Sequence, residues 1–199
     1  MNNKVEDNSA LIIVDMQNDF LLPNGNLYVP GTEEELSSFG GPEELIEEIK
    51  DLANNVFNTK SSIYFTTEDR HPTDHIEFNV FDPHCVVNTV GQEYHKDLNG
   101  VYNRAVDNIV KGENPSVTSY SVYTSVDFFD HVEFLRTNNI KTIYVAGVAY
   151  NFCVCESAIA YACQMFNTYI VRNMSLSVPG VGVGVEPVLN YYGVKNILL

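Results

Sequence analysis

The sequence contains few basic residues and no tryptophan. Lysine and arginine total 11 against 26 aspartate and glutamate residues, which gives a formal net charge of -15 at pH 7. Nucleic acids and anionic membranes require a basic surface, so we expect neither as a partner. No apolar run approaches the length of a membrane span. This charge balance sets no limit on a small-molecule substrate.

The chain also lacks the cysteine spacing of a zinc site. Its four cysteines are Cys85, Cys153, Cys155 and Cys163, and no two of them form a CxxC pair. No charged-then-apolar leader opens the sequence. We therefore expect reduced thiols in a cytoplasmic protein. The oligomeric state, a homo-oligomer included, is left open.

The length of 199 residues and the absence of repeats and linkers predict a single domain spanning residues 1–199. Apolar runs alternate with helical patterns, which predicts an α/β fold: a doubly wound, mostly parallel sheet with helices on both faces. Residues 1–8 are expected to be frayed and 21–39 to form a loop. The expected strands are 10–14, 62–66, 109–111, 143–146, 168–171 and 194–199, and the expected helices are 42–56, 127–138, 185–192 and one beginning near Cys153.

The segment Thr142–Phe166 places a cysteine where a buried strand becomes a helix. Cys153 follows the apolar run 143–146 and Gly147, and it precedes small residues typical of a tightly packed helix. Free N–H groups and the helix dipole at such a position favour an anion, so the pattern predicts a lowered thiol pKa and a nucleophile. The alternative is a small core residue, because buried cysteines are common.

Polar residues follow two other predicted strands. Asp15 ends the run 10–14, and Asp69 and His71 follow the run 62–66. Two residues apart in an extended segment, Asp69 and His71 face the same way and could form a two-histidine, one-carboxylate metal site with a further histidine. Asp15 alone could instead cap a helix or lie in a turn, and Asp69 and His71 alone could mark a polar turn.

Several histidines could supply the third metal ligand. The candidates are His75, His84 and His95, whereas His131 lies on a predicted helix far along the chain. His84 follows a proline turn and precedes apolar residues, so it is favoured over His95, which lies among charged residues.

Lys111 ends the short run 109–111 and could point into a cleft, although most lysines are solvated. Asp15, the pair Asp69 and His71, and Cys153 then all lie beyond the carboxyl ends of predicted parallel strands. Open α/β sheets bind their ligands at that edge. The sequence therefore predicts one site there.

The chain resembles the nicotinamidases, within the isochorismatase-like cysteine hydrolases, from Ala10 to about Val171. Five motifs in the expected order carry the resemblance. They are Val14–Phe20, Asp69–Pro72, Pro83–Val86, Lys111–Gly112 with Ser119–Ser121, and Gly147–Ala149 leading to Cys153 and Val154. The resemblance implies an isochorismatase-like three-layer sandwich that hydrolyses nicotinamide to nicotinate and ammonia in NAD salvage.

Site residues are implied by the same resemblance. Cys153 matches the nucleophile, Asp15 its base and Lys111 the third member of the triad. A cis peptide is implied at Val148–Ala149, where the N–H groups of Ala149 and Cys153 would form the oxyanion hole. The resemblance further assigns Asp69, His71 and His84 as ligands of a divalent metal (Zn²⁺, with Mn²⁺ or Fe²⁺ as alternatives), and Phe20 and Phe81 as the aromatics that sandwich the substrate ring.

The sequence departs from the family pattern at several positions. Arg70 stands where a tryptophan is common, and Tyr150-Asn151 replaces Thr-Asp. Glu77 matches an extra metal ligand of some members. Two alternative functions stay open. One is a related hydrolase that acts on carbamoyl or ureido amides, although such hydrolases generally lack the three metal ligands. The other is a catalytically idle relative that serves as a binding or scaffold protein.

Overall fold

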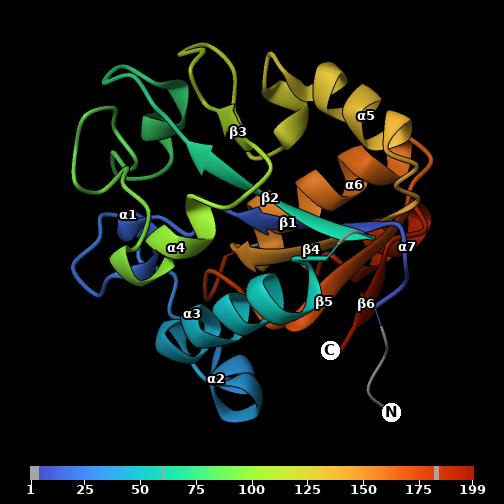
Figure 1. The fold of residues 1–199 in the computed structure, drawn as a ribbon. Coiled ribbons are helices and arrows are strands. Elements are labelled where there is room, and N and C mark those ends of the chain that lie inside the picture. The colour runs from blue at the N-terminus through green and yellow to red at the C-terminus, as the bar shows by residue number, and fades with distance from the viewer. Residues whose placement is uncertain (1–4, 60, 182–183) are drawn as a thin grey trace.

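A computed structural model describes residues 5–59, 61–181 and 184–199. A six-stranded sheet with the order β3-β2-β1-β4-β5-β6 runs through the centre of the molecule, and every neighbouring pair in it is parallel (Figure 1). Helices cover both faces, which confirms the predicted α/β sandwich. The strands are β1 (Ser9–Val14), β2 (Ser62–Asp69), β3 (Asn108–Lys111), β4 (Thr142–Val148), β5 (Asn167–Leu176) and β6 (Lys195–Ile197).

Two strands extend further than the sequence indicated. β2 continues to Asp69 because its last residues pair with β3, with Asp69 opposite Lys111. Asp69 and Lys111 are therefore neighbours, each the last residue of its strand. β5 continues to Leu176, beyond the predicted end at residue 171, and Leu176 pairs with Val148.

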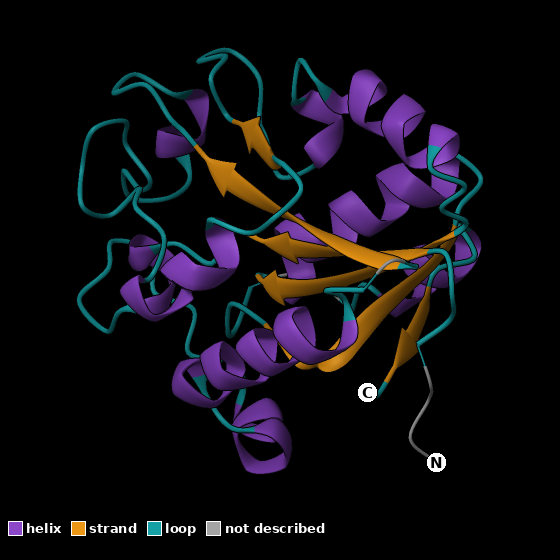
Figure 2. Ribbon diagram, in the orientation of Figure 1, coloured by secondary structure: helices purple, strands orange, loops and turns teal. Residues whose placement is uncertain are grey.

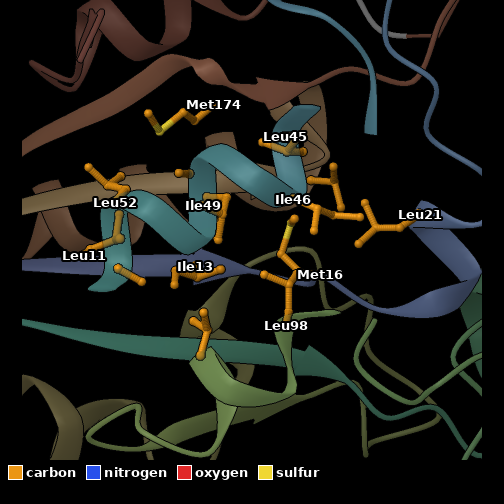
Figure 3. Close-up of a cluster of buried hydrophobic side chains, with 14 of the residues drawn as sticks. Leu11, Ile13, Met16, Leu21, Leu45, Ile46, Ile49, Leu52, Leu98 and Met174 are labelled. Atoms are coloured by element: carbon orange, nitrogen blue, oxygen red, sulfur yellow. The ribbon is translucent and has the colours of Figure 1, made fainter. Parts of the chain in front are cut away.

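One face of the sheet is covered by α3 (Pro42–Asp51), which continues into a π-helical turn, Leu52–Val56. Pro42 opens this helix and acidic residues occupy its first turn, a pattern typical of a helix start. Figure 3 shows the apolar stripe of α3 packed on the sheet. The labelled residues that meet there include Leu45, Ile46, Ile49 and Leu52 from the α3 segment, Leu11 and Ile13 from β1, and Met174 from β5.

The other face carries α5 (Phe128–Thr137), α6 (Cys155–Cys163) and α7 (Glu186–Tyr191). The apolar pattern of residues 127–138 predicts an inward face formed by Phe128, Phe129, Val132, Phe134 and Leu135. Phe128, Val132 and Leu135 are buried, as this pattern predicts. Phe129 and Phe134 were also expected to point inward, but they are 58% and 40% exposed. The width of the buried stripe of α5 was therefore overestimated.

The expectation of a loop across residues 21–39 is wrong at its end. Helix α2 spans Glu33–Phe39. Thr32 accepts a hydrogen bond from the N–H of Glu35, whose carboxylate in turn accepts from the N–H of Thr32. The sequence Thr-x-x-Glu encodes this reciprocal capping box. The turn residues just before it, Pro30 and Gly31, favoured a loop instead. Residues 1–4 of the predicted frayed segment lie outside the described residues, whereas Glu6 is hydrogen-bonded to Tyr144 and Thr142 of β4.

The chain order changes direction between β1 and β4. From β1 the sheet grows through β2 to β3 on one side and through β4 to β5 and β6 on the other. Arrowheads in Figure 2 show that these strands end on the same side of the molecule, where long loops and the short helices α1 (Asn18–Leu21) and α4 (Asn99–Tyr102) gather. Such a switch point is where open α/β sheets form a ligand crevice.

Candidate active site

Three buried groups meet at the carboxyl edge of the sheet. The Lys111 ammonium lies 2.8 Å from Asp15 Oδ2 and donates to Cys153 Sγ at 3.6 Å. A third contact joins it to Asp69 Oδ1 at 2.6 Å. The structure thus brings together Asp15, Lys111 and Cys153, which the sequence placed at separate strand ends.

Local backbone geometry fixes these side chains. Asp15 follows β1 with a positive φ of 50°, and Thr67 of β2 donates to its Oδ1 at 2.6 Å. Gly147 has a φ of 118°, and a Cβ there would lie 2.2 Å from the carbonyl oxygen of Val14. Glycine therefore lets β4 approach β1 closely just before the peptide Val148–Ala149, which is cis, as expected.

Lys111 is a fully buried ammonium between two carboxylates. Burial opposes its charge, but Asp15 and Asp69 outweigh this and raise its pKa well above the ordinary value. Burial raises the pKa of Asp15 despite the attraction of Lys111. For Asp69, burial is outweighed by Lys111 and the neighbouring histidines, and its pKa is lowered. The cluster therefore separates one carboxylate that holds its charge from one that accepts a proton more readily.

The predicted low pKa of Cys153 is wrong. Cys153 lies in the π-helical turn Tyr150–Val154 that leads into α6, near the helix start as expected. Burial raises its thiol pKa well above the ordinary value, with Lys111 opposing and Asp15 reinforcing the shift. The helix-terminus argument omitted this desolvation. Cys153 therefore rests as a thiol, and a base must remove its proton for it to act as a nucleophile.

Asp69, His71 and His84 form a compact group of potential metal ligands. One donor atom from each lies within 4.8 Å of the others, and all three residues are buried. The Nε2 atom of His71 has no hydrogen-bond partner among the described residues, while its Nδ1 lies 3.3 Å from the carbonyl of Gly112. His84 Nδ1 is likewise engaged, 2.8 Å from the carbonyl of Asp82. These backbone contacts leave the Nε2 atoms for a ligand, so the donor set fits a divalent metal such as Zn²⁺.

The other histidines occupy different places. His75 packs on His71 with ring centroids 4.1 Å apart, and with Glu77 and His71 it forms a second group within 4.8 Å. The Glu77 carboxylate already accepts two hydrogen bonds, one from the backbone N–H of Ser119 and one from the Ser119 hydroxyl. His95 lies outside both groups and accepts from the N–H of Asp97. His131 lies on α5 against Phe65, on the opposite face of the sheet from α3.

A pocket opens over Cys153, and the space between its walls, open solvent included, is about 360 Å³. Predicted residues Phe20, Phe81 and Ala149 all line it, with Asp69, Glu77 and His84 at its polar end. Tyr120, from the motif Ser119–Ser121, also lines it, and the lining residues that no sequence pattern singled out are Leu27, Val29, Phe152 and Val178. Burial raises the pKa of Tyr120 well above the ordinary value, so its phenol stays protonated.

The sequence analysis did not identify the side chains that support this site, because they act by hydrogen-bonding to the backbone of the site residues and their neighbours. The Gln17 amide donates to the carbonyl of Asp69 and accepts from its N–H, both at 2.8 Å. Asp19 accepts from the N–H of Cys85 at 2.7 Å and so fixes the residue after His84. At Gly112, a Cβ would lie 2.6 Å from the His71 ring. Only the run Val14–Phe20, which contains both polar residues, offered a signal.

The chain belongs to the isochorismatase domain family, whose model matches residues 9–179. It is a hydrolase of this family related to nicotinamidases. It is 32% identical to the nicotinamidase of Schizosaccharomyces pombe, over 81% of this chain and 80% of that protein. The nicotinamidase of Acinetobacter baylyi is 28% identical, over 84% of this chain and 81% of that one.

Solved structures agree on the fold. PnC1 from L. infantum, crystallised with nicotinate, superposes with a TM-score of 0.83 at 26% identity, covering 100% of this chain and 96% of that one. The pyrazinamidase of Pyrococcus horikoshii in complex with zinc gives 0.75 at 28% identity, covering 96% and 99%. Among the described residues, no helix has the length and apolarity needed to cross a membrane.

Proposed function

We propose that this protein hydrolyses nicotinamide to nicotinate and ammonia, with Cys153 as nucleophile and Asp15 as base. The observation that carries the proposal is one buried constellation. A thiol, an ammonium and a carboxylate lie together beneath a small aromatic pocket that also exposes His84 and Asp69. The nicotinate bound to the L. infantum relative and the names of the curated relatives favour a pyridine carboxamide as substrate.

The first half of the reaction uses the unequal carboxylates. Carboxylate oxygens of Asp15 and Asp69 lie within 4.8 Å of Cys153 Sγ, and Asp15 is the one whose pKa is raised. Asp15 takes the thiol proton as Sγ attacks the carboxamide carbon. The tetrahedral adduct then expels the amide nitrogen, which receives that proton and leaves as ammonia. Lys111 keeps its charge throughout and stabilises the anions around it.

The second half regenerates the enzyme. A water molecule attacks the thioester carbon and passes one proton to Asp15, the C–S bond breaks, and that proton returns to the thiolate sulfur. Nicotinic acid leaves and loses its remaining carboxyl proton to solvent to give nicotinate. The N–H groups of Ala149 and Cys153 would stabilise the oxyanion in both halves. Phe20 and Phe81, which both contact the His84 ring, would hold the pyridine ring between them.

Asp69, His71 and His84 would hold the divalent metal. It would supply a Lewis-acid site for the pyridine nitrogen, which orients the ring. The carboxylate whose charge is favoured, Asp69, belongs to both the ion cluster and this ligand group. Because the metal would act on the pyridine nitrogen, its loss would affect substrate binding more than the thiol.

The first experiment is ammonia release from nicotinamide by purified protein, before and after chelation and with Zn²⁺ or Mn²⁺ added back. We expect turnover that falls on chelation and returns with metal. Metal content of His84→Ala, with His95→Ala as matched control, reports on the ligand assignment independently of turnover. Absence of turnover in metal-loaded protein would contradict the proposal and direct the search to carbamoyl and ureido amides.

A further inference from the structure

One wall of the pocket is held by side chains instead of by strand pairing. Val178 lines the pocket together with Ala149, Phe152 and Cys153. It comes two residues after the end of β5 at Leu176. Ser177 N–H donates to Glu35 of α2 at 3.0 Å, and Val178 N–H donates to Asn151 Oδ1 at 3.0 Å. The position of this wall therefore depends on Glu35 and Asn151.

Asn151 uses its whole carboxamide for this contact. Besides accepting from Val178, its Nδ2 donates to the carbonyls of Val178 at 3.0 Å and Val181 at 2.6 Å. An aspartate of the same shape could accept from the N–H but could donate to neither carbonyl, and its charge would face two carbonyl oxygens. The contact thus requires an amide at this position.

We propose that Asn151 is a specificity-determining positioning residue that sets the distance between the Val178 wall and Cys153. Asn151 and Cys153 lie two residues apart in the same π-helical turn, so the wall is fixed relative to the nucleophile itself. A wall fixed in this way cannot recede, and ring substituents that would point at Val178 are excluded. The inference rests on the proposed function only in assuming that the ring of the substrate occupies this pocket.

Kinetics with two amides test the inference. Asn151→Asp loses the two donated hydrogen bonds and Asn151→Ala loses all three. For both variants we expect the KM for nicotinamide to rise by about fivefold or more, with kcat within about twofold. The preference for nicotinamide over a bulkier ring-methylated nicotinamide should fall by a similar factor. Asn190→Asp, the same chemical change at an exposed position of α7, should match wild type. A uniform fall in kcat with unchanged preference would overturn the inference.

A second readout needs no turnover. Cys153 displaces iodide from iodoacetamide and from N-phenyliodoacetamide, and peptide mass spectrometry separates its alkylation from that of Cys163, which is exposed. We expect wild type to favour the small reagent, and Asn151→Ala to reduce that ratio by about fivefold. Val178→Ala, which removes wall volume and leaves the amide in place, should reduce it as well.

The two readouts separate the two claims. A reduced alkylation ratio in protein that does not hydrolyse nicotinamide would uphold the wall and refute the proposed substrate. Normal nicotinamide turnover with an alkylation ratio that neither Asn151 variant changes would uphold the substrate and refute the role of Asn151.

Discussion

Two groups of buried polar side chains differ in how charge is handled. At the carboxyl edge of the sheet, Lys111 forms ion pairs with Asp15 and Asp69. On the α5 and α6 face, His131 and Tyr161 lie with ring centroids 5.7 Å apart, and His131 Nε2 and the Tyr161 hydroxyl have no hydrogen-bond partner among the described residues. The first group is ionic and paired, whereas the second is neutral and unpaired.

The difference follows from the cost of burying charge. A charge far from water is retained only where opposite charges and hydrogen bonds compensate, and an apolar replacement is often as stable. Lys111 keeps its ammonium because two carboxylates hold it. Burial outweighs the opposing effect of Asp107 and lowers the pKa of His131 to about 4, so this ring stays neutral. Buried charge beneath a pocket therefore indicates chemistry, and a buried neutral ring indicates packing.

The largest expected effect is on turnover, from Cys153→Ala. Loss of the nucleophile should lower kcat by about 10⁴-fold or more, while metal content and thermal stability stay near wild type. Cys163→Ala, which changes the exposed cysteine, is the matched control. Activity near wild type in Cys153→Ala would show that the ionic group does not serve this thiol.

Lys111→Met should have the next largest effect, because it leaves Asp15 and Asp69 buried without their partner. We expect about 3–5 kcal/mol lower free energy of unfolding in urea, together with loss of turnover. Lys195→Met on the edge strand β6, where the side chain is exposed, should change stability by less than about 0.5 kcal/mol. Equal free energies of unfolding for Lys111→Met and Lys195→Met would contradict the claim that the buried, paired ammonium matters more for stability than an exposed one.

The sheet and its functional edge could be predicted because buried parallel strands read as apolar runs. Asp15, Asp69 and Lys111 each sit at the end of such a run, and parallel strands bring their carboxyl ends together. The individual roles of these residues came from the resemblance to nicotinamidases, since residue spacing alone left caps and turns as alternatives. The contact of Lys111 with both carboxylates depends on the register of β2 and β3, which local sequence does not encode.

Burial depth was the main quantity that sequence could not supply. The helix-start position of Cys153 suggested a low pKa, but desolvation reverses the shift. Likewise, Asn151 and Gln17 hold backbone that is distant in sequence, and the motif that contains Gln17 does not indicate which backbone its side chain contacts. His84 was favoured over His95 from its proline turn, and the structure places His84 beside Asp69 and His71.

The smallest expected effect is on the free energy of unfolding and comes from the neutral pair, His131 and Tyr161. The pKa of His131 is about 4 in the folded protein against 6.5 for an unperturbed histidine. Between these values the unfolded chain binds more protons, so stability is present above the unfolded pKa and is lost as pH falls toward the folded one. From roughly pH 7 to pH 5 this should remove about 2 kcal/mol. Urea unfolding at several pH values measures it.

His131→Phe should abolish this part of the pH dependence, because the ring that must stay neutral is gone. Asp107, Asp127 and Asp130 line the same cavity and are present in both proteins, so the comparison is between wild type and variant at each pH. Turnover should stay within about twofold, since His131 lies on the face away from α3 and outside the pocket lining. Parallel stability curves for the two proteins would mean that His131 titrates normally, and that the contrast with the charged group is smaller than its burial indicates.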